Sequence, residues 1–101
     1  MKTFVIRRRK AWASPKVLER VAARSRKIGD EEMSDRVRWI RSYVVHEDDG
    51  TLGTVCIYQA TGPEAITEHA ARVGMPADEI IEVADTVIVR PDPVPAPAER
   101  A

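Results

Sequence analysis

Asp49 and Gly50 stand between two long runs of β-branched and aromatic residues that alternate with polar ones. Tight β-hairpin turns prefer the dipeptide Asp-Gly, because their turn positions need residues that accept positive φ. The runs over 37–47 and 52–60 are therefore predicted to be neighbouring antiparallel strands. The segments before and after the hairpin must then supply the elements that pack against it.

The segment before the hairpin predicts a strand followed by a helix. Residues 3–10 are rich in β-branched and long side chains, which favours a short strand. Ser14 and Pro15 provide an N-cap and a proline at the first helical position. Apolar residues then recur at helical spacing, and we expect the helix to end at Gly29. The alternative is that the acidic connector 30–35 retains a last helical turn around Met33.

The segment after the hairpin predicts a second helix and a last strand. Gly62 and Pro63 open the helix, Gly74 ends it, and the run over 80–90 is typical of a strand. The complete order is β-α-β-β-α-β, the split motif of a ferredoxin-like sandwich. The predicted fold class is α+β, with four antiparallel strands and both helices on one face.

The length and composition indicate a single globular domain with an extended tail. The chain has 101 residues, of which 44% are hydrophobic and 32% charged, and this balance is ordinary for a packed domain. We assign residues 1–90 to the domain. Residues 91–101 contain four of the seven prolines at alternate positions, so we expect an extended, mostly unpacked tail.

The charges and the cysteine count narrow the choice of partners and compartment. Sixteen basic residues balance sixteen acidic ones, so no overall field attracts nucleic acid or an anionic membrane. The basic run 7–10 alternates between the two faces of a strand and has no interleaved aromatic residues, which also disfavours nucleic acid. No apolar run is long enough to cross a membrane. One cysteine indicates a reducing, cytoplasmic location.

The two faces of the predicted hairpin differ in character. If Asp49 and Gly50 fill a two-residue turn, opposing residues have numbers that sum to 99. One face is then mostly aliphatic and forms the floor for the helices. The other face lies away from the helices, is too apolar for water, and holds Trp39, Arg41, Tyr43, Cys56 and Tyr58.

That second face predicts a homodimer packed sheet against sheet. The alternative is a solvated face with scattered aromatic residues. Trp39, Arg41, Tyr43 and Tyr58 are also candidate ligand-binding residues, because aromatic walls with one charged group suit a small planar or anionic molecule. A plain subunit interface enriches the same residue types.

His69 and Cys56 are the candidate metal ligands. In this register they lie on opposite sides of the sheet, so they cannot share one site within a chain. A closed site needs about four nitrogen or sulfur ligands, which leaves a site between two subunits, or one completed by water and carboxylates around nickel. As an alternative, His69 is a core histidine or a general base, with Ser42 as its polar partner.

Four ordered segments resemble a known family. They are VRWIRSYV (37–44), CIYQA (56–60), AITEHA (65–70) and VGMPADEI (73–80). In this spacing they resemble the small bacterial ferredoxin-like family of unknown function that includes a nickel-binding, nickel-responsive protein. The resemblance implies a cytoplasmic homodimer with nickel as a cofactor. The matching polar positions are Trp39, Ser42, Tyr43, Cys56, Tyr58 and His69.

Three functions remain open at this point. The first is a homodimeric protein that binds a divalent metal, nickel by resemblance, through His69 and Cys56. The second is a dimeric small-molecule binder, or an enzyme of the isomerase or cofactor-free oxygenase type. It would use an enclosed cavity in which His69, Tyr43 and Arg41 handle an organic substrate. That hypothesis rests on fold analogy. The third is a structural dimer without chemistry.

Overall fold

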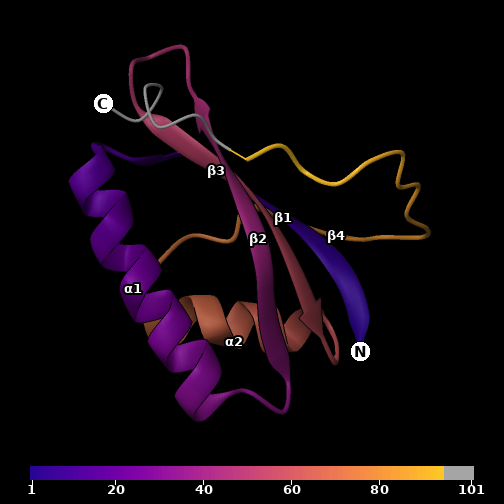
Figure 1. Ribbon diagram of the computed structural model, residues 1–101. Coiled ribbons are helices and arrows are strands. Elements are labelled where there is room, and N and C mark those ends of the chain that lie inside the picture. Colours follow the sequence, from indigo (N-terminus) through magenta and orange to yellow (C-terminus); the bar gives the residue numbers. More distant parts are fainter. Residues whose placement is uncertain (95–101) are drawn as a thin grey trace.

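A computed structural model describes residues 1–94 of the chain. Its elements follow the order β1 (Lys2–Trp12), α1 (Pro15–Glu32), β2 (Val37–His46), β3 (Leu52–Ala60), α2 (Pro63–Val73) and β4 (Glu79–Glu82). The four strands form one antiparallel sheet in the order β2-β3-β1-β4. Figure 1 shows both helices on one side of this sheet. The predicted ferredoxin-like α+β fold is confirmed.

The helix signals in the sequence act as predicted at three of the four ends. The Ser14 hydroxyl accepts a hydrogen bond from the Val17 amide and caps α1. Helix α2 begins at Pro63 and ends at Gly74, which takes the left-handed conformation with φ +85°.

The fourth helix end differs from the prediction. Helix α1 runs through Gly29 and continues to Glu32. Gly29 is buried, and a Cβ atom there would lie 3.4 Å from Nε2 of His69. Gly29 therefore lies at the contact of α1 with α2, where a Cβ atom would touch the His69 ring, and it does not stop the helix.

The hairpin turn is one residue longer than the predicted two-residue turn. His46 and Leu52 are the last residues of the strand pair, and beyond them the Glu47 amide donates to the Thr51 carbonyl at 3.0 Å. The loop itself is therefore residues 48–50, in which Gly50 has φ +87°. The Gly50 amide donates to the Glu47 carbonyl, which closes a turn centred on Asp48 and Asp49, with Gly50 in the left-handed position. This arrangement is the usual three-residue hairpin loop.

The longer loop shifts the strand register and overturns the predicted face of Trp39, Cys56 and Tyr58, whereas Arg41 and Tyr43 lie on the face away from the helices, as predicted. Ser42, not Tyr43, lies opposite Cys56, and Trp39 lies opposite Tyr58 after a further irregularity at Ile40. A one-residue shift moves side chains to the other face of the sheet. The face that carries Cys56 and Tyr58 lies beneath the helices and is buried, where the sequence had placed it away from them.

The opposite side of the sheet carries no helix. We call it the open face; it is formed by Val5, Arg41, Tyr43, Val55, Ile57 and Ile81. Val5 pairs with both Ile57 and Ile81, which makes an aliphatic row across three strands. Ile81 is 51% exposed and Tyr43 44%.

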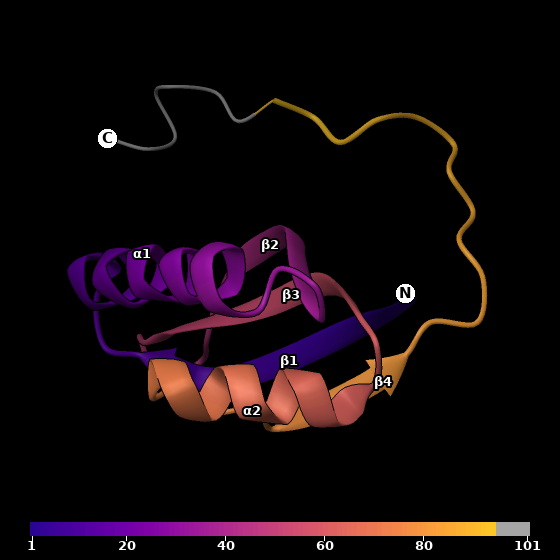
Figure 2. The same ribbon diagram turned by 90° about the horizontal axis from the view of Figure 1, so that it is seen from below.

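The last strand is shorter than the predicted strand 80–90. Strand β4 pairs with β1 in a register that puts Glu82 opposite Phe4, and it ends there, with one further bond from the Val83 amide to the Thr3 carbonyl. Because β1 starts at Lys2, this register soon leaves the later residues without a pairing strand. Figure 2 shows the segment after β4 leading away from the sheet. Val87, Ile88 and Val89 within it are 78–87% exposed.

The predicted tail is described only in part. Residues 91–94 are irregular and exposed, and residues 95–101 lie outside the described residues. Within the part of the chain that the structure describes, no helix combines the length and hydropathy needed to span a membrane.

Candidate functional site

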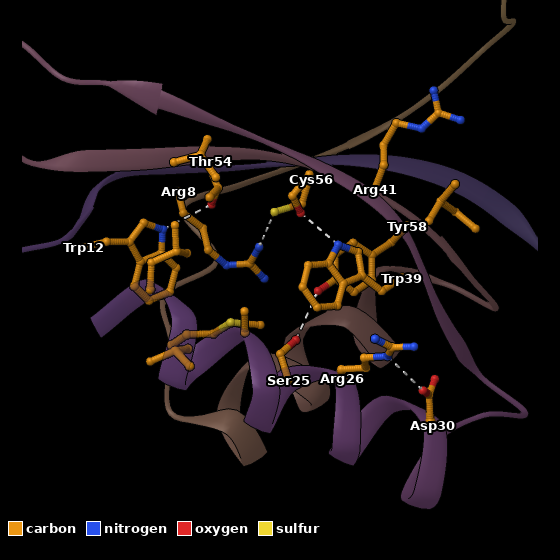
Figure 3. Close-up of a pocket in the computed structure, with 17 residues that line it drawn as sticks. Arg8, Trp12, Ser25, Arg26, Asp30, Trp39, Arg41, Thr54, Cys56 and Tyr58 are labelled. Carbon is orange, nitrogen blue, oxygen red and sulfur yellow. Dashed lines mark hydrogen bonds and ion pairs between the residues drawn. The ribbon is translucent and has the colours of Figure 1, made fainter. Parts of the chain in front are cut away.

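A cavity of about 690 Å³ lies between α1 and the helix-facing side of strands β1, β2 and β3. Figure 3 shows side chains from α1 and from the sheet converging on it. We call it the α1 cavity. Its lining residues are Arg8, Trp12, Leu18, Val21, Ala22, Ser25, Arg26, Asp30, Trp39, Ile40, Arg41, Ser42, Val44, Thr54, Cys56, Tyr58 and Met75.

Arg8 reaches the inside of the molecule because β1 alternates between its two faces. Phe4, Ile6 and Arg8 point toward the helices and are each at most 2% exposed. The Arg8 guanidinium donates from Nε to the Pro76 carbonyl at 2.6 Å and from Nη1 to Sγ of Cys56 at 3.2 Å. Its third nitrogen group, Nη2, is buried without a hydrogen-bond partner.

Two stacked aromatic rings form one wall of the α1 cavity. The rings of Trp39 and Tyr58 are nearly parallel, with centroids 6.2 Å apart. Their polar atoms have partners, because Trp39 donates to the Ser42 hydroxyl at 2.8 Å and the Tyr58 hydroxyl bonds that of Ser25 at 3.3 Å. Burial raises the pKa of Tyr58, so its phenol stays protonated at neutral pH.

Cys56 lies beneath α1 and not on the open face. It is 4% exposed and accepts the hydrogen bond from Arg8. The prediction that the sheet separates Cys56 from His69 is therefore wrong. Both belong to the helix side, where Tyr58 lies next to the His69 ring, with centroids 5.8 Å apart.

His69 packs between the two helices and does not line the α1 cavity. Its Nε2 lies 3.0 Å from the Ser25 carbonyl oxygen. A carbonyl only accepts, so Nε2 carries the hydrogen and Nδ1 of the neutral ring has none. Nδ1 is buried without a partner. Burial lowers the pKa of His69, which favours this neutral form. The predicted partner Ser42 is bonded to Trp39 instead.

The polar groups of Arg41 and Tyr43 are engaged by the segment after β4. Arg41 points away from α1 (Figure 3) and donates to the Asp92 carboxylate at 2.8 Å. The Tyr43 hydroxyl donates to the same carboxylate at 2.9 Å. Three of the four predicted ligand-binding residues, Trp39, Arg41 and Tyr58, line the α1 cavity, and Tyr43 does not. The polar groups of Arg41 and Tyr43 hold the segment after β4.

The residues present do not fit a nickel site within one chain. Among residues 1–94, no group of three or more histidine, cysteine, aspartate and glutamate side chains is arranged to hold a metal ion. Cys56 faces the positive guanidinium of Arg8, which opposes a cation. His69 offers one free nitrogen, which is fewer than a protein metal site needs.

Arg8 is the site residue that the sequence reading missed. It lies within the basic run 7–10, which resembles a solvated charge cluster. Arg7, Arg9 and Lys10 do form salt bridges, with Glu47, Glu79 and Asp48. The period-2 alternation with Phe4 and Ile6 was the signal that places Arg8 on the buried face.

A comparison with known protein families finds a match over most of the chain. The model of a family described as nickel responsive protein SCO4226-like matches residues 4–83. The chain belongs to this family. The matched range contains both helices, strands β2, β3 and β4, all of β1 except its first two residues, and every residue that lines the α1 cavity.

A solved structure supports the same fold. The crystal structure of SCO4226 from Streptomyces coelicolor A3(2) is 20% identical in sequence, with a TM-score of 0.66. The similarity covers 84% of this chain and 99% of that one. No protein with a curated description matches the chain.

Proposed function

We propose that this member of the nickel-responsive family is a small ligand-binding protein whose binding site is the α1 cavity. The observation that carries the proposal is the buried guanidinium of Arg8, with its unpartnered Nη2, at the edge of a cavity of about 690 Å³. Small-molecule sites in proteins usually occupy about 300–1,000 Å³ and combine apolar walls with a few polar groups.

The test fills the cavity without changing the rest of the surface. Ala22 lines the cavity from α1, whereas its neighbour Ala23 is exposed. Thermal-shift and calorimetric screening of small organic molecules should find binders of the wild type and of Ala23→Phe that fail to bind Ala22→Phe. Equal binding to both variants would place the ligand elsewhere and contradict the proposal.

We also propose that the protein is a homodimer that packs through the open face. The support is the aliphatic row of Val5, Ile57 and Ile81, together with the exposed apolar residues 87–89. A surface of this kind usually has a partner. The single, buried cysteine is consistent with the cytoplasmic location that we propose for this dimer.

Nickel binding is the second candidate function, and family membership is what favours it. Calorimetric titration of tag-free protein with nickel, compared with magnesium, tests it, together with His69→Ala and Cys56→Ala. Nickel heat that one variant loses would identify that residue as a ligand. If both variants still release the heat of nickel binding, the ligands are other residues. If the wild type releases none, the protein does not bind nickel.

A further inference from the structure

The charge of Arg8 has no counter-ion among the described residues. Nine salt bridges connect their acidic and basic side chains, and Arg8 takes part in none of them. Its guanidinium contacts the Pro76 carbonyl, the Cys56 sulfur and the ring of Tyr58, whose centroid lies 5.9 Å from the guanidinium carbon. A thiol is a weak acceptor, so the positive charge stays largely uncompensated.

A buried charge without a counter-ion is costly, and proteins keep one where it has a task. Arg8 is 1% exposed, and Nη2 is the one guanidinium nitrogen without a partner. A guanidinium binds carboxylate and phosphate groups through strong charge-assisted hydrogen bonds. The ligand group that would pair with the Arg8 guanidinium is therefore an anion.

The rest of the lining selects a flat, apolar molecule. The parallel rings of Trp39 and Tyr58 form a wall against which a planar ring can stack. Their polar atoms are already bonded to serine hydroxyls, so they do not require further partners from a ligand. Apolar walls come from Trp12, Leu18, Val21, Ala22 and Met75. The lining also includes Arg26 and Asp30, which form an exposed salt bridge with each other.

We infer that the α1 cavity binds a planar aromatic carboxylate, whose carboxylate pairs with Arg8 and whose ring packs along Trp39. This inference rests on the proposed function and names its ligand class. The exposed side chains of Ile40 and Val44 on edge strand β2 provide an apolar rim over which such a ring can enter.

The experiment compares two probes of the same ring and nearly the same shape, the anionic 2-naphthoate and the neutral 2-naphthamide, whose NH2 group replaces one acceptor oxygen. Calorimetry on the wild-type protein should show the acid binding about ten- to hundredfold more tightly than the amide, as expected for a charge-assisted hydrogen bond. Arg8→Met should remove this preference. Methionine fills the space with an apolar chain, and replacing a buried charge in this way is often tolerated.

The two proposals fail in different ways. If the amide binds the wild type as well as the acid does, and Ala22→Phe abolishes both, the cavity is a ligand site but the inference about anions is wrong. If neither probe binds, and a series of smaller and larger planar acids and amides also fails, both proposals fall. The comparison of the two probes on the wild type needs no variant, so a misfolded Arg8→Met would not obscure the result.

Discussion

At the scale of single residues, burial and hydrogen bonding decide what the candidate side chains can do. His69 looked like a metal ligand or a general base in the sequence. In the structure it holds α1 against α2, through the Ser25 carbonyl and the close approach of Gly29. Arg8 looked like a surface charge and is instead fully buried beside the α1 cavity.

The neutral state of His69 predicts a pH dependence of stability. Burial lowers its pKa in the folded protein below the ordinary value of 6.5, so the unfolded chain takes up the proton first as the pH falls. The free energy of unfolding should therefore decrease as the pH falls through 6.5, by at most about 1.4 kcal/mol per pH unit for one proton.

Urea unfolding at pH 5.5 and 7.5 measures this effect, and His69→Gln should lose the part of the slope that the imidazole causes. His46 is exposed, so His46→Gln is the matched control and should keep the wild-type slope. Equal slopes in the wild type and in His69→Gln would show that His69 does not titrate differently in the two states.

Glu68 predicts a second, more acidic dependence. Two hydrogen bonds of 2.9 Å from Arg36, with help from Arg72, lower its pKa to about 2. The stabilisation is present above the unfolded value near 4.5 and is lost as the pH falls toward 2. Glu68→Gln should therefore lower the melting temperature slightly at pH 7 and leave it unchanged near pH 2.

The effect of Glu68→Gln should be small because water screens these partly exposed groups. Glu64→Gln is the control on the same helix, since Glu64 forms no salt bridge among residues 1–94. A loss that is the same size at both pH values would contradict the ionic origin.

At the scale of elements, close approach at the hairpin end of the sheet keeps β1 and β3 in register. Gly53 lies on β3 at this end of the sheet. A Cβ atom there would be 2.8 Å from both the Arg8 carbonyl and Nη1 of Arg7, and would also contact the Glu47 carboxylate. Arg7 and Glu47 form a half-buried salt bridge at 3.2 Å above it.

Gly53→Ala should consequently destabilise the protein by about 1–3 kcal/mol, the usual cost of overpacking. Chemical denaturation measures the change. Val44→Ala on the same hairpin is the control, because Val44 is 52% exposed and should change stability by less than about 0.5 kcal/mol. If Gly53→Ala leaves the free energy of unfolding unchanged, the neighbouring strands can move apart without cost.

At the scale of the whole molecule, a monomer and a dimer differ in whether the open face and the segment after β4 are exposed or buried. Asp92, held by Arg41 and Tyr43, brings this segment back to the open face without covering Ile81 or residues 87–89. The apolar surface that remains exposed is what a second copy would bury.

Ile81→Lys tests the proposed dimer. In a monomer this residue is already 51% exposed, so a charge there should be harmless, whereas in a dimer it would enter the interface. Analytical ultracentrifugation should show a wild-type dimer and an Ile81→Lys monomer. Val44→Lys, 52% exposed but on the helix side of the sheet, should remain dimeric. A monomeric wild type would remove the proposal.

The sequence by itself determined the features that depend on neighbouring residues. Ser14 caps α1, Gly74 ends α2 in the left-handed conformation, and the hairpin turns between His46 and Leu52. These signals are local, because a cap or a turn is formed by side chains and backbone within a few positions of each other. The order of elements, and with it the fold, follows from them.

Only the tertiary structure decided which side of the sheet each residue faces. One extra residue in the turn and an irregularity at Ile40 placed Cys56 beneath the helices, because side chains alternate with a period of two. The length of β4 depended on where its partner β1 begins. The alternation along β1 indicates the face of Arg8, but its contacts depend on α1 and on the Pro76 loop, which are distant in sequence and so are not indicated by any local pattern.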